Sequence, residues 1–291
     1  MAFNLKPKHA IGKRVALLLL REIDTALAAL ARGPLDDESI HSARRCGKRS
    51  RALLRLARPL LSEKRYRREN RCWRELGQRL SAARGATALG TSIDRLHALY
   101  PDRLSVKDAK VLHAQTTPIR SAALRSLRKE FVGVTADLSS ARRRIAAWRK
   151  LRGWHRILQG VENGHLSAQR AFHEAVRNPD PGHRHEWRKR LKTLCYQAHL
   201  LRQVWPLMLQ AWEGQMERLG DMLGEEHDLH LLRNYLHKLP ANREAAKRAD
   251  RIARSRIHCL RLQTKDLGEQ LHAEPTAMLI ARLRACRSAS P

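Results

Sequence analysis

Acidic residues are scarce in this chain of 291 residues. It has 28 aspartates and glutamates against 58 lysines and arginines, which gives a formal net charge of +30 at pH 7. A compact protein with such an excess repels itself unless an anionic partner neutralises it. Because hydrophobic residues make up an ordinary 43%, the charge must lie on folded faces rather than in disordered tails. The composition therefore points to polyphosphate, nucleic acid or an anionic membrane as partner.

Paired cysteines and long apolar runs are also missing. The five cysteines contain no CxxC pair, which argues against a disulfide framework and against a zinc site. The apolar run from Val15 to Leu20 stops at Arg21, short of the roughly 7 to 15 residues of a signal-peptide core. No stretch approaches the ~20 apolar residues of a transmembrane helix. We expect a cytoplasmic protein in a reducing compartment, without a membrane span.

Catalytic signatures are absent as well. The sequence has no GxxxxGK[ST], GxGxxG, HExxH or GxSxG motif, and its carboxylates are too sparse for a metal-dependent phosphatase. One acidic patch, from Asp221 to Asp228, is more simply explained by pairing with basic side chains or by helix capping. We expect no enzymatic activity, no cofactor and no bound metal. A phosphatase is the alternative from the enzyme class.

Apolar residues recur at intervals of three and four almost throughout, and aromatic residues make up only 4%. Since runs with the period of two typical of strands are missing, the sequence predicts an all-α protein. Asp36, Asp37 and Glu38 resemble an acidic helix start. Breaks between helices are expected at Gly33-Pro34, Pro59, Tyr100-Pro101, Gly153, Asn178 to Gly182, Pro206, Pro240 and near Pro275.

Two motifs occur twice, in the same order. The first is His41-x-x-Arg44-Arg45-x-x-Lys48, which returns 144 residues later as His185-x-x-Arg188-Lys189-x-x-Lys192. The second is Leu76-Gly77-x-x-Leu80, which returns 143 residues later as Leu219-Gly220-x-x-Leu223. This repetition indicates duplication of a helical unit. We expect two bundle halves of about four helices each, 12–140 and 141–275, related by pseudo-symmetry, and a tail at 276–291.

Each copy of the first motif predicts a helix with one cationic face and one apolar face. At 100° per residue, one side of the first helix carries His41, Arg44, Arg45, Lys48, Arg51 and Arg55, and the other carries Ala43, Cys46, Leu53, Leu54 and Ala57. In the second helix, His185, Arg188, Lys189, Lys192 and His199 lie opposite Trp187, Leu191, Leu194, Ala198 and Leu201. No carboxylate interrupts the first stripe between Ser39 and Ser62, so its cations repel one another without a ligand.

Arginine forks match phosphate oxygens, lysine adds a mobile point charge, and the two leading histidines can donate to phosphate. These side chains suit a flexible chain of phosphates whose bonds need not be broken. The alternative of ordinary solvated helix faces stays open, although such faces usually mix charges. Non-specific RNA or DNA binding also stays open, because the net charge alone gives some affinity. A membrane contact through Arg142, Arg143 and Arg144 is a weaker alternative.

The repeated motifs resemble those of the CHAD family, the helical domains named for conserved histidines. His41 to Leu53 resembles the first signature of the family, and His185 to Tyr196 is similar to the second, HxxRKxxKxLxY. The later Leu-Gly element also matches, except that Gly85 stands where the family has an aspartate after the residue that is Arg84 here. The likeness extends from about Lys13 to Leu271.

Membership of that family would imply two antiparallel four-helix bundles related by pseudo-twofold symmetry around a basic central groove or pore. It would also imply binding of inorganic polyphosphate and association with polyphosphate granules in the cell. The residues expected to contact phosphate are then His41, Arg44, Arg45, Lys48, Arg51, Arg55, His185, Arg188, Lys189 and Lys192.

Overall fold

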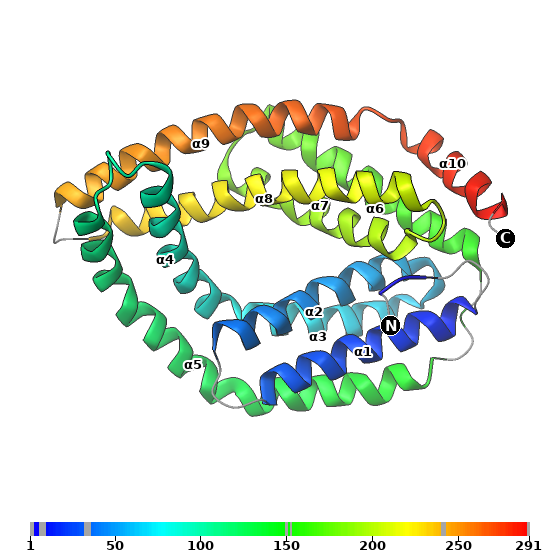
Figure 1. The fold of residues 1–291 in the computed structure, drawn as a ribbon. Coiled ribbons are helices and arrows are strands. Elements are labelled where there is room, and N and C mark those ends of the chain that lie inside the picture. Colours follow the sequence, from blue (N-terminus) through cyan, green and yellow to red (C-terminus); the bar gives the residue numbers. More distant parts are fainter. Residues whose placement is uncertain are drawn as a thin grey trace.

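The computed structural model describes residues 3–5, 10–31, 36–148, 151, 153–239 and 243–289, without the side chains of 128–132 (Figure 1). This part of the chain forms ten α-helices and one short 3₁₀ helix and contains no strand, which confirms the all-α expectation. None of the described helices combines the length and the apolar content needed to cross a bilayer.

The helices follow one another with short connections. Before residue 100 they are α1 (Ile11–Ala31), α2 (Asp37–Leu56), the 3₁₀ helix η1 (Arg58–Leu60), α3 (Glu63–Arg79) and α4 (Ser81–Leu99). After it come α5 (Val106–Ala146), α6 (Trp154–Arg177), α7 (Pro181–Leu201), α8 (Pro206–Leu236), α9 (Arg243–His272) and α10 (Thr276–Ala289). The expected boundary between halves, near residue 140, falls inside α5.

Most of the expected breaks separate helices in the structure. Gly153 precedes α6 with φ of 113°, a backbone conformation that glycine adopts most readily. Pro206 opens α8, where its missing N–H costs nothing. Two features were not expected: α3 passes to α4 at Leu80 without glycine or proline, and Pro118 lies inside α5. The expected breaks at Gly33-Pro34 and Pro240 lie outside the described residues.

The start of α2 fixes the direction of the first basic stripe. The side chain of Asp36 accepts a hydrogen bond from the backbone N–H of Ser39 at 2.8 Å, and the Ser39 hydroxyl receives the Asp36 N–H in return. Asp37 and Glu38 occupy the first turn, where carboxylates favour the helix dipole. The acidic helix start predicted from the sequence is therefore confirmed.

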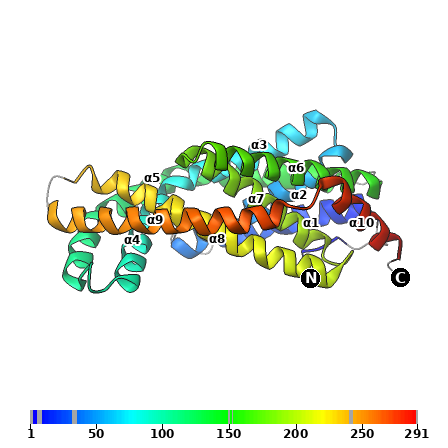
Figure 2. The same cartoon turned by 90° about the horizontal axis from the view of Figure 1, so that it is seen from above.

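The apolar faces of α2 and α7 are buried as predicted. At most 2% of the surface is exposed at Ala43, Cys46, Leu53, Leu54, Ala57, Trp187, Leu191, Leu194, Ala198 and Leu201. The larger core that they join runs from Phe3 to Leu283. A smaller core combines α4, the start of α5, the end of α8 and α9, and Figures 1 and 2 show α8 and α9 running together towards it. Both cores draw residues from each side of position 140.

One close contact between α2 and α6 yields a test of this packing. A Cβ atom added at Gly160 would lie 1.9 Å from the carbonyl oxygen of Leu56. We expect Gly160→Ala to lower the free energy of unfolding by about 1 to 3 kcal/mol, because the helices must separate. Gly214→Ala on α8 is the matched control: its Cβ meets open space, so helix propensity should stabilise it by about 0.5 to 1 kcal/mol. Equal thermal melting of both variants would contradict the contact.

Candidate functional site

The two basic helix faces meet where α2 packs against α7. The side chains that come together there are Arg44 and Lys48 of α2, Arg84 of α4, and Arg188 and Lys192 of α7, which we call the cation cluster. Four of its five members were on the predicted stripes. Arg84 was not, because its position on a third helix gives no periodic signal.

The pKa of Lys48 shows how burial and neighbouring charges act on the cation cluster. Its side chain still contacts solvent, but the surrounding protein lowers its pKa to about 8, with further lowering by Arg188, Arg44, Lys192 and Arg84. Burial also lowers the pKa values of Arg44 and Arg188. The cluster is therefore held against mutual repulsion, and a bound anion would relieve that repulsion.

The two copies of the repeated motif make the same contact. Arg44 donates from Nη1 to the carbonyl oxygen of Gly77 at 3.0 Å, and Arg188 donates from Nε to the carbonyl oxygen of Gly220 at 3.2 Å. In both cases the first motif meets the glycine of the second motif. A backbone carbonyl orients the guanidinium without neutralising it, so its other donors stay available for an anion.

Glycines on α8 make room for the two cations of α7. A Cβ atom at Gly220 would lie 2.6 Å from Cε of Lys192, and one at Gly224 would lie 2.7 Å from Nη2 of Arg188. These glycines stand one helical turn apart, like the cations they accommodate. A larger residue at Gly220 would displace Lys192, and a larger residue at Gly224 would displace Arg188.

The acidic patch pairs internally, as expected. Asp221 accepts a hydrogen bond from Nζ of Lys192 at 2.9 Å, and Asp228 lies 3.9 Å from Arg84. These two carboxylates reach a cluster of five cations, so its net charge stays positive. Asp228 also explains how Arg84 is held although Gly85 replaces the expected aspartate: the partner comes from the other half of the chain.

The leading histidines differ in their surroundings. His185 stacks on His227 with ring centroids 4.0 Å apart. Burial lowers the pKa of His185 to about 4, with His227, Lys189 and Arg188 adding to the effect. His41 is exposed, and its pKa is lowered by the surrounding protein and by Lys48. His227 could not be predicted as a neighbour of the stripe, because nothing in the sequence shows that it stacks on His185.

The remaining α2 cations form a second group, nearer the end of the helix. Arg55 donates from Nη1 to the hydroxyl of Thr193 at 2.9 Å, which links α2 to α7. Arg51 donates to the side chain of Asn70 at 3.2 Å, and burial lowers its pKa to about 10, with Arg55 and other cations contributing. Arg190, which is not on the predicted stripe, also acts on both arginines.

Besides the two histidines, three further stripe residues lie outside both groups. Lys189 forms an ion pair with Glu186 at 2.5 Å, one turn back along α7. Arg45 is exposed on the flank of α2 that faces Glu22. His199, counted on the face of the second stripe, contacts Oε1 of Glu213 at 2.8 Å. The structure thus brings together the central part of each stripe and leaves its margins apart.

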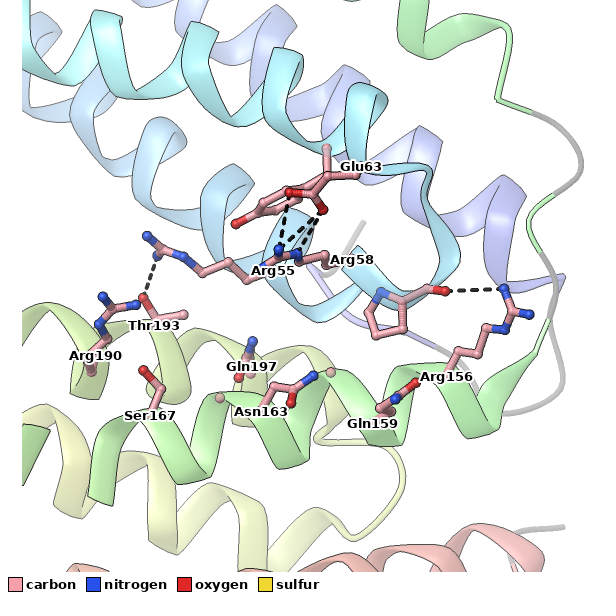
Figure 3. Close-up of a pocket in the computed structure, with 14 residues that line it drawn as sticks. Arg55, Arg58, Glu63, Arg156, Gln159, Asn163, Ser167, Arg190, Thr193 and Gln197 are labelled. Carbon is pink, nitrogen blue, oxygen red and sulfur yellow. Dashed lines mark hydrogen bonds and ion pairs between the residues drawn. The ribbon is translucent and has the colours of Figure 1, made fainter. Parts of the chain in front are cut away.

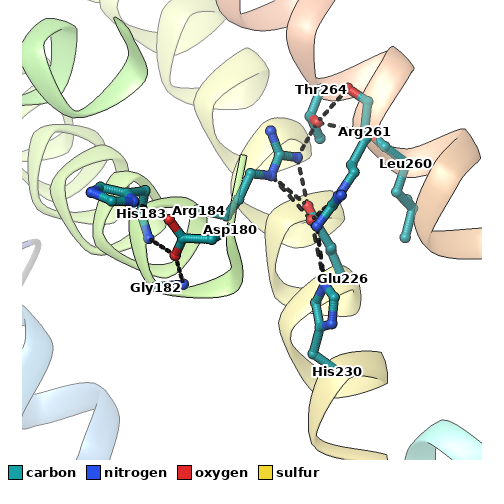
Figure 4. Close-up of polar contacts among 9 residues, drawn as sticks. All are labelled: Asp180, Gly182, His183, Arg184, Glu226, His230, Leu260, Arg261 and Thr264. Atoms are coloured by element: carbon teal, nitrogen blue, oxygen red, sulfur yellow. Dashed lines mark hydrogen bonds and ion pairs between the residues drawn. The ribbon is translucent and has the colours of Figure 1, made fainter. Parts of the chain in front are cut away.

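A buried ionic network holds the start of α7 against α8 and α9 (Figure 4). Arg184 donates to Glu226 at 2.5 Å and to the hydroxyl of Thr264 at 2.5 Å, while Arg261 donates to Glu226 at 3.0 Å. Burial alone would raise the pKa of Glu226, but hydrogen bonds from His230, Arg184 and Arg261 outweigh it and lower the pKa to about 2. The network fixes α7 directly before His185.

Comparison with known proteins gives a family match and a fold match. The family model described as CHAD domain matches residues 14–237. The structure is similar to PptA from Streptomyces chartreusis, with a TM-score of 0.66 and 17% identity over 91% of this chain and all of that one. It is also similar to the CHAD domain from the plant Ricinus communis, with a TM-score of 0.59 and 19% identity over 99% of this chain and 95% of that one. No curated protein matched the sequence.

The buried network makes stability depend on pH. Glu226 is 1% exposed, and its pKa is lower in the folded chain than in the unfolded one. Its ionised form therefore contributes stability above about pH 4.5, and this contribution is lost as the pH falls towards about 2. We expect Glu226→Gln to lower the free energy of unfolding at pH 7 by about 3 kcal/mol and to flatten the acid dependence.

Denaturant unfolding between pH 2 and pH 7 measures this effect. Glu269→Gln is the matched control, because Glu269 is 58% exposed on α9 and its loss should change stability by less than about 0.5 kcal/mol. An acid profile of Glu226→Gln that parallels the wild-type profile would contradict the role given to the network.

Proposed function

The chain belongs to the CHAD domain family, and from that premise we propose that it binds inorganic polyphosphate without cleaving it. The observation that carries the proposal is the convergence of both repeated motifs on one cation cluster, where Lys48 of the first copy lies among Arg188 and Lys192 of the second. Ordinary solvated faces mix opposite charges and would gain nothing from such crowding.

The spacing of the cations favours an elongated ligand. Arg44 and Arg55 are 11 residues apart on α2, which corresponds to about 16 Å at the usual rise of an α-helix. A compact anion cannot contact both ends of that distance, whereas a chain of phosphates can. Arginine forks and lysine ammonium groups along this path offer repeated, equivalent contacts to repeated, equivalent charges.

The residues proposed to contact phosphate are those of the two stripes except His199, together with Arg84, which lies in the cation cluster. They are His41, Arg44, Arg45, Lys48, Arg51, Arg55, Arg84, His185, Arg188, Lys189 and Lys192. Arg44, Lys48, Arg84, Arg188 and Lys192 form the centre of the site. Lys189 and Arg45 act at its margin, where Lys189 must exchange Glu186 for phosphate.

The architecture proposed around this site is a pair of antiparallel four-helix bundles, 12–140 and 141–275, related by pseudo-twofold symmetry, with a tail at 276–291. Their contact would form a basic central groove with the cation cluster inside. Equivalent contacts of Arg44 with Gly77 and of Arg188 with Gly220 support that symmetry. Binding in the groove would bring the protein to polyphosphate granules in the cytoplasm.

Non-specific binding to RNA or DNA is the second candidate, and the net charge of +30 favours it. With aromatic residues at 4%, the chain offers few platforms on which bases could stack. The crowding of cations between two helices also matches a bare phosphate chain better than a nucleic acid with bulky bases. We therefore rank polyphosphate first.

Removal of two cluster cations tests the proposal. We expect Arg188→Ala with Lys192→Ala to weaken polyphosphate binding by roughly 100-fold, because each charge-assisted contact contributes on the order of 1.5 to 3 kcal/mol. Lys247→Ala with Arg251→Ala removes the same charge from exposed positions on α9 and should cost less than about threefold. Calorimetric titration of folded variants measures both, and equal losses would refute a localised site.

A further inference from the structure

A polar pocket lies beside the second group of arginines, at the end of α2 (Figure 3). It has a volume of about 730 Å³ and is lined by side chains of α2, η1, α3, α6 and α7. Arg55 and Arg58 contribute from one side, and Arg156, Arg190 and Gln197 contribute from the other. The pocket is thus continuous with the proposed polyphosphate path through Arg55.

Gln197 is the most informative residue of the pocket. It is 1% exposed, yet within the described part of the chain neither Nε2 nor Oε1 has a hydrogen-bond partner. A buried amide without partners costs free energy, and a phosphate oxygen that reaches Nε2 would accept the hydrogen bond that this group lacks. Counting back 144 residues, the offset of the repeated histidine motif, leads to Leu53, which is buried in the core. At the position equivalent to Gln197, the chain therefore has an apolar residue that only packs in the core.

Two arginines of the pocket are oriented but not neutralised. Arg55 donates to the Thr193 hydroxyl, and Arg156 donates to the carbonyl oxygen of Pro59 at 3.2 Å, so neither meets a carboxylate in these contacts. The other two are paired: Arg58 contacts Glu63 at 3.2 Å, and Arg190 contacts Glu186 at 2.6 Å. Arg55 and Arg156 keep the pocket positive, with arginine forks and one amide as donors.

The floor of the pocket is closed. The backbone of Gly160 lies directly against the carbonyl of Leu56, so a phosphate chain cannot pass between α2 and α6 at that level. One turn along α6, a Cβ atom at Gly164 would lie 2.1 Å from Oε1 of Gln197. A linear ligand cannot leave the pocket through this floor, so the group that would lie against it is a terminal phosphate.

In the other half of the chain, another segment lies over two residues that are equivalent to residues of the pocket region. The same offset relates Arg55 to His199, and Arg49 to Thr193. Phe3 stacks on His199 with ring centroids 6.2 Å apart. Cζ of the Arg49 guanidinium lies over the Phe3 ring, 3.9 Å from its centroid. The segment of residues 3–5 therefore covers in one half the place that stays open as a pocket in the other.

We propose that the pocket around Gln197 binds a terminal phosphate group, either the end of a polyphosphate chain or the end of a free short linear phosphate. The first source rests on the proposed polyphosphate function, whereas the second does not. A terminal phosphate carries more charge and more acceptor oxygens than an internal one, which suits a pocket where two arginine forks and an amide act as donors.

Linear tripolyphosphate and cyclic trimetaphosphate, which has no ends, provide the test. We expect the wild-type chain to bind the linear form more tightly by roughly tenfold, and Gln197→Leu to reduce that ratio to below about threefold. This substitution changes no charge, so the general attraction of both anions is unaffected. It also copies Leu53, the residue at the equivalent position. An unchanged ratio in a folded Gln197→Leu variant would overturn the proposal.

Arg156→Gln is the second variant, because Arg156 is exposed and its loss should not endanger folding. We expect it to weaken tripolyphosphate binding by roughly fivefold, against less than about twofold for Arg170→Gln, an exposed control on the same helix. Equal effects of the two substitutions would count against the pocket.

Titration with long-chain polyphosphate separates this proposal from the proposed function. Long chains have few ends, so Gln197→Leu should bind them within about twofold of the wild type. Failure of the wild type to bind long chains would refute the polyphosphate function but not the pocket, which the tripolyphosphate ratio tests by itself. Displacement of tripolyphosphate in proportion to chain ends would identify the polymer end as occupant. Lack of displacement would identify a free short phosphate.

Discussion

Cations packed between α2 and α7 repel one another, and the surrounding fold holds them together despite that repulsion. Burial, together with the nearby charges of Arg188 and Arg44, lowers the pKa of Lys48 to about 8. The apolar core on the opposite faces of the two helices holds them in place against this repulsion. Trp187 and Leu53 bury the reverse faces of the two helices completely, so the helices cannot rotate their charges into solvent without exposing the core. The backbone carbonyls of Gly77 and Gly220 orient the guanidinium groups of Arg44 and Arg188 without neutralising them.

Much of this arrangement could be predicted because it depends on helical periodicity. A rotation of 100° per residue is enough to separate Ala43 and Leu54 from Arg44 and Lys48, and their burial is confirmed. The repeat likewise indicated two equivalent stripes and the family to which the chain belongs. The neighbours of the stripes could not be predicted in this way. Arg84 comes from another helix, and its contact with Asp228 crosses the chain, so no local spacing encodes it.

The turn at Leu80 and the pocket were missed for different reasons. Leu80 ends α3 with ordinary helical dihedral angles, so the chain turns without the glycine or proline that marks a break in a sequence. The pocket depends on Gly160 and Gly164, whose close approach to Leu56 and Gln197 is a property of helix packing. The repeated motifs make the two halves of the sequence look alike, whereas Phe3 on one side and Gln197 on the other make them chemically different. The cation cluster therefore uses cations from both motif copies, while the pocket depends on residues that do not repeat.

The salt dependence of binding distinguishes a surface that is merely basic from a site shaped for phosphate. The protein would be titrated with long-chain polyphosphate and with RNA of equal phosphate content at increasing salt. Polyphosphate binding that persists at about 0.15 M salt while RNA dissociates is the result expected from cations fixed between two helices. Parallel loss of both ligands would contradict the account, since it would leave only the attraction of a net positive charge.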